Sequence, residues 1–242
     1  MNRPVTSLCL AAALLGFGGC HDQPVARTIC LIDISRSIDP GSVRDAFAAA
    51  NRFVDRMTRG DELDLVPITG DARNELQGHV LRLRAPTKRQ PFDSDLAAFR
   101  ADSHKQISAM VDWALANPPG YTDILGTLQF ALQDLGNATP VQRRLILLSD
   151  FLEDDGVLDF AKDPHLVSVA NAKAFADSLA KNSKLRCDCP IFLGLLRTNG
   201  HHGLSRERQD AVGAFWAKLL GTPQNPTSIH NDGVSALGGY VE

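Results

Sequence analysis

The chain has 242 residues, of which 44% are hydrophobic and 22% are charged, and its formal net charge is -3 at pH 7. This composition excludes a disordered or fibrous protein, and one α/β domain of this length can bury a full core without a disulfide framework. Lysine and arginine are scattered along the chain and form no basic stripe, so we expect no nucleic-acid partner.

The N-terminus has the features of a bacterial secretion signal. A basic start precedes an apolar stretch over residues 8–15, and glycines lead to Cys20. The stretch is too short to span a bilayer as a helix, which favours a signal peptide over a membrane anchor. The ending resembles the lipobox of bacterial lipoproteins, apart from Phe17, where leucine is usual. We expect a signal peptide over residues 1–19, an acylated Cys20 that anchors the protein to a membrane, and a tether over residues 20–27. The predicted location is the bacterial cell envelope, on the periplasmic side or at the outer membrane.

Three cysteines remain after the signal peptide and the lipidated residue: Cys30, Cys187 and Cys189. This number leaves room for one disulfide and one free thiol in an oxidising compartment. Because Cys30 lies in an apolar run, we expect it to pack as a small hydrophobic residue.

Hydrophobic patterning predicts alternating strands and helices from residue 28 to residue 220, followed by a tail over residues 221–242 that supplies a short strand or none. The expected strands cover residues 28–34, 62–69, 79–83 (a half-exposed edge), 144–148 and 190–196. The expected helices cover residues 46–57, 94–116 with an interruption near Asp102, 124–135, 166–181 and 205–220. This order indicates a doubly wound, mostly parallel sheet flanked by helices, a Rossmann-like α/β fold.

Three polar motifs follow the ends of predicted elements, where ligands bind in such folds. Asp33, Ser35 and Ser37 follow the first strand, Thr122 opens a helix, and Asp150 follows a later buried strand. A spacing of two residues lets the first three side chains point to one side. Carboxylates combined with hydroxyls are hard oxygen ligands that suit Mg²⁺, and also Mn²⁺ or Ca²⁺, better than zinc or copper.

Another acidic run follows this last motif, at residues 153–155. A second cation site is one interpretation of it, and a solvated acidic loop is the simpler one.

The three motifs, in this order, resemble the metal-ion-dependent adhesion site of the von Willebrand factor type A (vWA) family. The resemblance covers roughly residues 28–220 and implies that Asp33, Ser35, Ser37, Thr122 and Asp150 bind a divalent cation directly or through water. It also implies a non-enzymatic, cation-dependent protein-binding module. An open coordination position would accept an Asp or Glu carboxylate from a protein partner.

Two departures from the family pattern bear on this prediction. Phe151 stands where the family often has glycine, so the loop geometry around the metal could differ. The usual sixth strand before a final helix is not evident, which weakens any analogy with family members that move their last helix, here residues 205–220.

Two alternative functions remain. A haloacid-dehalogenase-like phosphatase also places an aspartate after its first strand and uses Mg²⁺, but its second aspartate is replaced here by Ser35, which cannot act as a general acid. A vWA scaffold that has lost metal-dependent binding is the other. A serine hydrolase is not supported, because the chain has no Gly-x-Ser-x-Gly motif.

Overall fold

The computed structural model describes residues 25–75, 78–88, 93–136, 142–182, 185, 188–198, 203–222 and 225–237. The expected signal peptide, Cys20 and Cys187 lie outside the described residues. Within these ranges, no helix has both the length and the apolar character needed to cross a bilayer.

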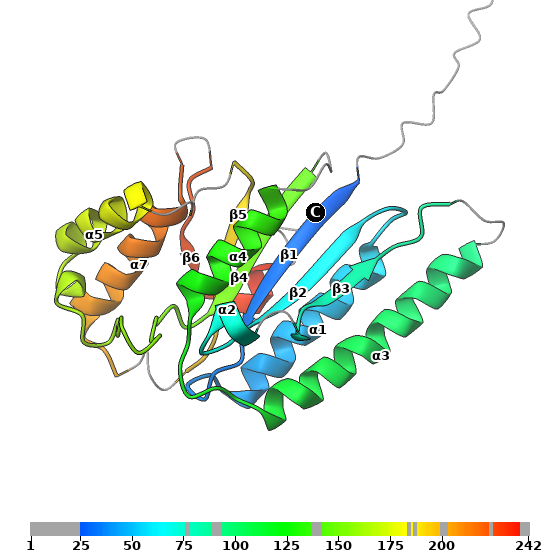
Figure 1. Cartoon of the computed structure of the whole chain (residues 1–242), viewed down its shortest axis with the longest axis horizontal. Helices are drawn as coiled ribbons and strands as arrows, with labels where there is room; N and C mark the ends of the chain where they lie inside the picture. Colours follow the sequence, from blue (N-terminus) through cyan, green and yellow to red (C-terminus); the bar gives the residue numbers. More distant parts are fainter. Residues whose placement is uncertain are drawn as a thin grey trace, which may run out of the picture.

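A single six-stranded sheet, in the order β3-β2-β1-β4-β5-β6, forms the centre of the molecule (Figure 1). Its strands are β1 (Ala26–Asp33), β2 (Glu62–Ile68), β3 (Leu81–Arg84), β4 (Gln142–Ser149), β5 (Ile191–Leu195) and β6 (Ile229–His230). All neighbouring pairs are parallel except β2 with β3, which is antiparallel and lies at an edge. The expected doubly wound, mostly parallel architecture and the half-exposed edge strand are confirmed.

Helices cover both faces of the sheet, because alternate residues of the central strands supply two separate hydrophobic cores. Ile29 and Leu31 of β1 pack into one core, whereas Ile32 packs into the other. The first core includes residues of α4 (Ile124–Gly136), α5 (Val169–Asn182) and α7 (Arg206–Leu220), with the short α2 (Ala72–Glu75) and the 3-10 turn η3 (Pro164–Leu166). The second includes residues of α1 (Pro40–Arg56) and α3 (Ser94–Ala116).

Helix α3 differs from its sequence prediction. It runs unbroken from Ser94 to Ala116, so the interruption expected near Asp102 is wrong. The segment contains no glycine or proline that would break a helix. Ser103 is buried, and the helix continues through it.

The tail after α7 supplies the sixth strand. Strand β6 pairs in parallel with β5 and is followed by the 3-10 turn η4 (Gly233–Ala236), whose neighbour Leu237 is buried in the second core. The alternative in which the tail forms a short strand is therefore the observed one. Helix α7 lies between β5 and β6 in the chain, and in the described residues only η4 follows β6.

The two described cysteines differ in state. Cys30 is a free thiol with 3% of its surface exposed, and it packs in the second core as expected. Burial raises the pKa of this thiol to about 12, so it stays protonated. Cys189 takes part in a disulfide.

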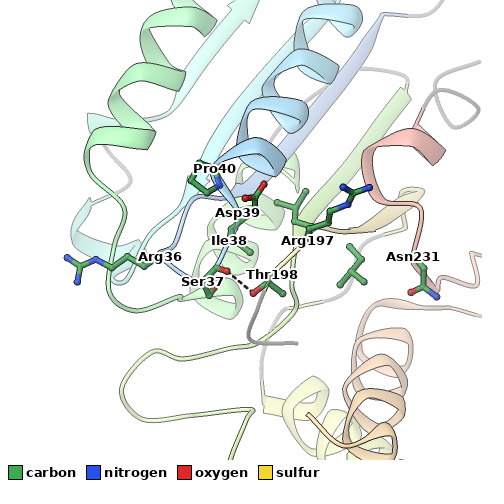
Figure 2. Close-up of a pocket in the computed structure, with 10 residues that line it drawn as sticks. Arg36, Ser37, Ile38, Asp39, Pro40, Arg197, Thr198 and Asn231 are labelled. Atoms are coloured by element: carbon green, nitrogen blue, oxygen red, sulfur yellow. Dashed lines mark hydrogen bonds between the residues drawn. The ribbon is translucent and has the colours of Figure 1, made fainter. Parts of the chain in front are cut away.

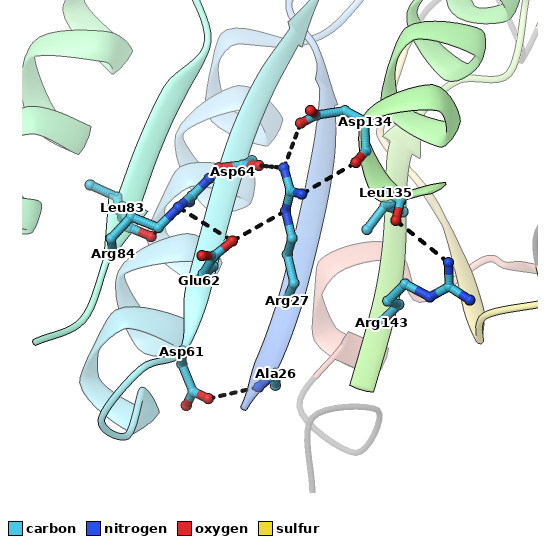
Figure 3. A network of polar contacts seen from close by, with 10 residues as sticks. All are labelled: Ala26, Arg27, Asp61, Glu62, Asp64, Leu83, Arg84, Asp134, Leu135 and Arg143. Carbon is cyan, nitrogen blue, oxygen red and sulfur yellow. Dashed lines mark hydrogen bonds and ion pairs between the residues drawn. The ribbon is translucent and has the colours of Figure 1, made fainter. Parts of the chain in front are cut away.

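An ion-pair network joins the amino ends of β1 and β2 to the carboxyl end of the antiparallel β3 (Figure 3). The Arg27 guanidinium on β1 pairs with Asp64 on β2 at 2.8 Å and with Asp134 on α4. The other carboxylate oxygen of Asp64 pairs with Arg84 on β3 at 2.6 Å. Because Asp33 lies at the opposite end of β1, this network stabilises the end of the sheet away from the predicted metal ligands.

Candidate metal centre

The loop after β1 brings Asp33, Ser35 and Ser37 together, as their spacing predicts. Asp33 is the last residue of the strand and is fully buried, and its Oδ1 accepts a hydrogen bond of 2.9 Å from the backbone N–H of Ser35. The hydroxyls of Ser35 and Ser37 lie 3.0 Å apart. Ser35 is buried and Ser37 is exposed, so the cluster opens to solvent at Ser37.

The end of β4 joins this cluster from the neighbouring strand. The Ser37 hydroxyl donates to Asp150 Oδ2 at 3.1 Å, and Asp150 Oδ1 accepts from the N–H of Leu152 at 3.0 Å. The hydroxyl of Ser149 donates to Asp33 Oδ2 at 2.6 Å and accepts from the N–H of Phe151. Four of the five predicted ligands therefore belong to one hydrogen-bonded cluster, and Ser149 fixes the orientation of Asp33.

Thr122 lies in the loop before α4, which is hydrogen-bonded to the loop after β1 and to the loop after β4. Its backbone pairs with Asp154 in the loop after β4, through an N–H···O bond of 2.7 Å and its reciprocal of 3.0 Å. Earlier in the same loop, the Pro119 carbonyl accepts a hydrogen bond of 3.1 Å from the backbone N–H of Arg36. Thr122 is buried, but no hydrogen bond between described residues joins its hydroxyl to the other four side chains.

The segment after β5 supports the serine loop through contacts that no local sequence pattern predicts. The Thr198 hydroxyl donates to the Ser37 carbonyl at 2.7 Å, and the Asp39 N–H donates to the Arg197 carbonyl at 3.1 Å. Asp39 also caps α1 by accepting from the Ser42 N–H at 3.0 Å. Helix α1 and the serine loop are thereby fixed to β5, and the bond between Ser37 and Thr198 is visible in Figure 2.

Burial shifts the pKa values of the two carboxyl groups in this cluster. Burial, with the nearby Asp150 carboxylate as a second cause, raises the pKa of Asp33 to about 7. Burial also raises the pKa of Asp150, although hydrogen bonds from Leu152 and Ser37 oppose the shift. No ion pair in the described part of the chain places a basic side chain on either carboxylate. Two buried carboxylates that have adjacent hydroxyls, and that pair with no described basic side chain, fit a hard divalent metal ion.

A pocket of about 650 Å³ adjoins this cluster (Figure 2). Its lining includes Ser37, Asp39, Thr198 and the two exposed arginines Arg36 and Arg197. Figure 2 shows these arginines on opposite sides of Ser37 and Thr198. A ligand that approached the serine loop from solvent would therefore meet positive charge on both sides.

Phe151 keeps the backbone conformation that glycine would favour at its position. Its φ angle is 64°, in the left-handed region, and its ring is fully buried. The Trp216 indole of α7 donates to the Phe151 carbonyl at 3.0 Å, and the two rings meet edge to face with centroids 6.0 Å apart. The phenylalanine therefore attaches the loop after β4 to α7.

The acidic run after β4 is not simply a solvated loop. Glu153 is fully buried, so that interpretation is wrong for this residue. Its Oε2 accepts from the N–H groups of Ile124 and Leu125, at 3.0 Å each, in the first turn of α4. Burial and the nearby Asp123 and Asp155 carboxylates raise the pKa of Glu153 well above its usual range. Glu153 and the start of α4 are far apart in the sequence, so no local sequence pattern predicts this contact.

Comparison with known proteins gives structural likeness only, since no protein-family model and no curated protein matches the chain. The human COPII-coat protein Sec24c is 14% identical over 90% of this chain and 32% of its own, with a TM-score of 0.53. The pilus adhesin SpaC from Lactobacillus rhamnosus GG is 12% identical over 92% of this chain and 30% of its own, with a TM-score of 0.50.

A third solved structure is the vWF domain of the type V pili tip protein Mfa5 from Porphyromonas gingivalis. It is 22% identical over 54% of this chain and 39% of its own, with a TM-score of 0.36. The matched region is thus less than half the length of each of these three chains. The strand order, the parallel core of the sheet and the likeness to Sec24c and SpaC together show a doubly wound, mostly parallel α/β fold, which is the fold that the resemblance to the von Willebrand factor type A family implies.

Proposed function

We propose that this chain is a non-enzymatic protein-binding module for adhesion or assembly on the bacterial cell envelope, and that its binding depends on a divalent cation. Asp33, Ser35, Ser37, Thr122 and Asp150 hold Mg²⁺, or Mn²⁺ or Ca²⁺ in its place. The metal keeps one coordination position for a carboxylate of the partner.

The observation that carries this proposal is the hydrogen-bonded cluster at the carboxyl ends of β1 and β4. Asp33 and Asp150 are buried side by side, and the Ser35 and Ser37 hydroxyls connect them. Burying two carboxylates is costly unless a positive charge compensates them, and a divalent cation supplies that charge. Ser37 is exposed, which leaves the metal reachable from solvent.

The surroundings of the cluster favour an acidic partner. Arg36 and Arg197 flank the adjoining pocket, and their positive charges add to the attraction that the metal exerts on an Asp or Glu side chain. Tyr121, beside Thr122, and Val157, in the loop after β4, are exposed by 58% and 88%. These two side chains would add apolar contact area around the metal-bound carboxylate.

The location on the envelope rests on the N-terminal segment. The apolar stretch over residues 8–15 and the glycines before Cys20 support export and acylation, so the partner would be met outside the cytoplasm. A pilus adhesin among the solved structures of similar fold agrees with this setting.

Calorimetric titration of the intact chain with Mg²⁺ and with Mn²⁺ tests the metal site. We expect one saturable binding event that Asp33→Ala abolishes, because the variant removes a buried carboxylate ligand. The matched control is Asp45→Ala, an exposed aspartate on α1, which should bind as the unaltered chain does. An Asp33→Ala isotherm that equals the control would contradict the site.

Partner binding is tested by affinity capture from bacterial envelope extract, once with Mg²⁺ and once with a chelator. We expect a protein that is retained only with Mg²⁺ and is lost with Asp33→Ala. The phosphatase alternative is tested with a generic aryl phosphate, and metal-dependent turnover of that substrate would contradict a non-enzymatic module.

A further inference from the structure

A second group of carboxylates lies beside the metal cluster and shares no residue with it. One oxygen from each of Asp123, Glu153 and Asp155 lies within 4.8 Å of the other two. The fold itself brings them together, because the backbones of Thr122 and Asp154 pair through reciprocal hydrogen bonds of 2.7 and 3.0 Å. The group is therefore a fixed junction between the loop before α4 and the loop after β4.

Glu153 is the buried member of this group, and half of its carboxylate has no protein partner. Its Oε2 accepts from two N–H groups at the start of α4. Its Oε1 is inaccessible to solvent and makes no hydrogen bond in the described part of the chain. A buried carboxylate oxygen without a partner is costly, and a cation bound between this oxygen and the two further carboxylates would offset that cost.

The two aspartates are held in place by backbone hydrogen bonds. Asp123 accepts from the N–H groups of Gly126 at 2.7 Å and of Ala72 at 3.1 Å. Asp155 accepts from the next turn of its own loop, with its Oδ1 bound by two N–H groups at 2.8 and 2.7 Å. No ion pair between described residues includes any of the three carboxylates.

We infer that Asp123, Glu153 and Asp155 bind a second divalent cation, with Ca²⁺ as the best fit. Ca²⁺ accepts about six to eight oxygen ligands in a flexible geometry, whereas Mg²⁺ is usually held by one or two carboxylates and keeps several waters. Three carboxylates whose oxygens lie within 4.8 Å of one another therefore suit Ca²⁺ better. Backbone carbonyls and water would complete its larger coordination shell.

The position of this site gives it a structural role. Asp123 follows Thr122 directly, and Glu153 lies in the loop that begins with Asp150. A cation shared by the two loops would hold Thr122 at a fixed distance from Asp150, and so prepare the neighbouring cluster for its own metal. The inference goes beyond the proposed function and does not require it, since the two sets of ligands are separate.

The test is calorimetric titration of the intact chain with CaCl₂, using Glu153→Gln and the matched control Asp154→Asn. Glutamine keeps one oxygen for the amides of α4 but removes the charge, so we expect the affinity of one Ca²⁺ to fall by about tenfold or more. Asp154→Asn removes a charge from the same loop outside the carboxylate group and should leave Ca²⁺ binding within about twofold. Asp155→Asn, at a partly exposed position, should repeat the loss if Glu153→Gln does not fold, with circular dichroism as the check of folding.

Titration in the Asp33→Ala background separates the two sites. We expect Asp33→Ala to retain one Ca²⁺ and Asp33→Ala/Glu153→Gln to bind none. If Asp33→Ala binds no Ca²⁺, or if Glu153→Gln and Asp155→Asn both bind Ca²⁺ as the unaltered chain does, the second site is overturned. If Glu153→Gln abolishes all binding and Asp33→Ala changes nothing, the second site stands and the proposed function loses its metal.

Discussion

Phe151 combines a costly backbone conformation with a stabilising side chain. A left-handed φ of 64° costs a non-glycine residue about 1–2 kcal/mol. The buried ring offsets this cost through its contacts with Trp216. The loop after Asp150 therefore adopts, at Phe151, a backbone conformation that favours glycine.

At Phe151 the glycine variant should be more stable than the alanine variant, which is the reverse of the usual order. Loss of the buried ring costs about 3–5 kcal/mol in either variant, but Phe151→Gly also removes the backbone strain. We expect Phe151→Gly to be more stable than Phe151→Ala by about 1 kcal/mol in urea denaturation. Phe160 is equally buried and is not among the residues with positive φ, so there the glycine variant should be the less stable one. The same order at both positions would contradict strain at Phe151.

Among the elements, the amino ends of β1 and β2 are joined by ion pairs to each other and to the carboxyl end of β3. Arg27, Asp64 and Arg84 come from three neighbouring strands, and Asp134 from α4 completes the network (Figure 3). The Asp64 side chain is only 1% exposed, whereas that of Asp134 is 31% exposed. The two carboxylates should therefore differ in their importance for stability.

Asp64→Ala should destabilise the chain far more than Asp134→Ala. Removal of one member of a buried ion pair costs about 3–5 kcal/mol, and we expect about 3 kcal/mol here because Arg27 keeps its contacts with Asp134 and Glu62. The half-exposed Asp134 should contribute about 1 kcal/mol or less. Urea denaturation of both variants measures the difference, and equal losses would show that burial does not set the strength of these pairs.

The sequence was sufficient for most strands and helices and for the clustering of four candidate ligands, because these depend on local periodicity and on where polar residues follow apolar runs. The DxSxS spacing and Asp150 place four oxygen-bearing side chains at adjacent strand ends, where the structure joins them. Contacts that depend on tertiary register were missed. The Arg27 to Asp64 pair follows from the alignment of Arg27 with Glu62, and the Glu153 cap on α4 follows from loop pairing.

At the scale of the whole molecule, titratable groups buried near the carboxyl ends of the strands make the stability depend both on pH and on metal binding. Asp33 has a folded pKa of about 7, above its usual value of 3.8. Between about pH 4 and pH 7 the folded chain therefore holds a proton that the unfolded chain releases. This contribution is fully present at low pH and is lost as the pH rises through 7.

We expect the metal-free chain, kept in chelator, to lose stability as the pH rises from 5 to 7, by up to about 1.4 kcal/mol per pH unit from Asp33 alone. Saturating Mg²⁺ should remove this decline, because the metal binds the ionised carboxylate. Thermal unfolding over this range measures both curves, and Asp33→Asn serves as the control because it removes the Asp33 carboxyl while Asp150 and Glu153 still titrate, so its decline should be smaller. A metal-free curve that is flat, or that matches Asp33→Asn, would contradict the raised pKa.

Strand β1 separates the expected tether from the serine loop. It begins at Ala26, within the last residues of that tether, and ends at Asp33. Seven residue steps of about 3.3 Å separate these ends by about 23 Å. In a chain acylated at Cys20, β1 would place this length of folded chain between the tether and the serine loop.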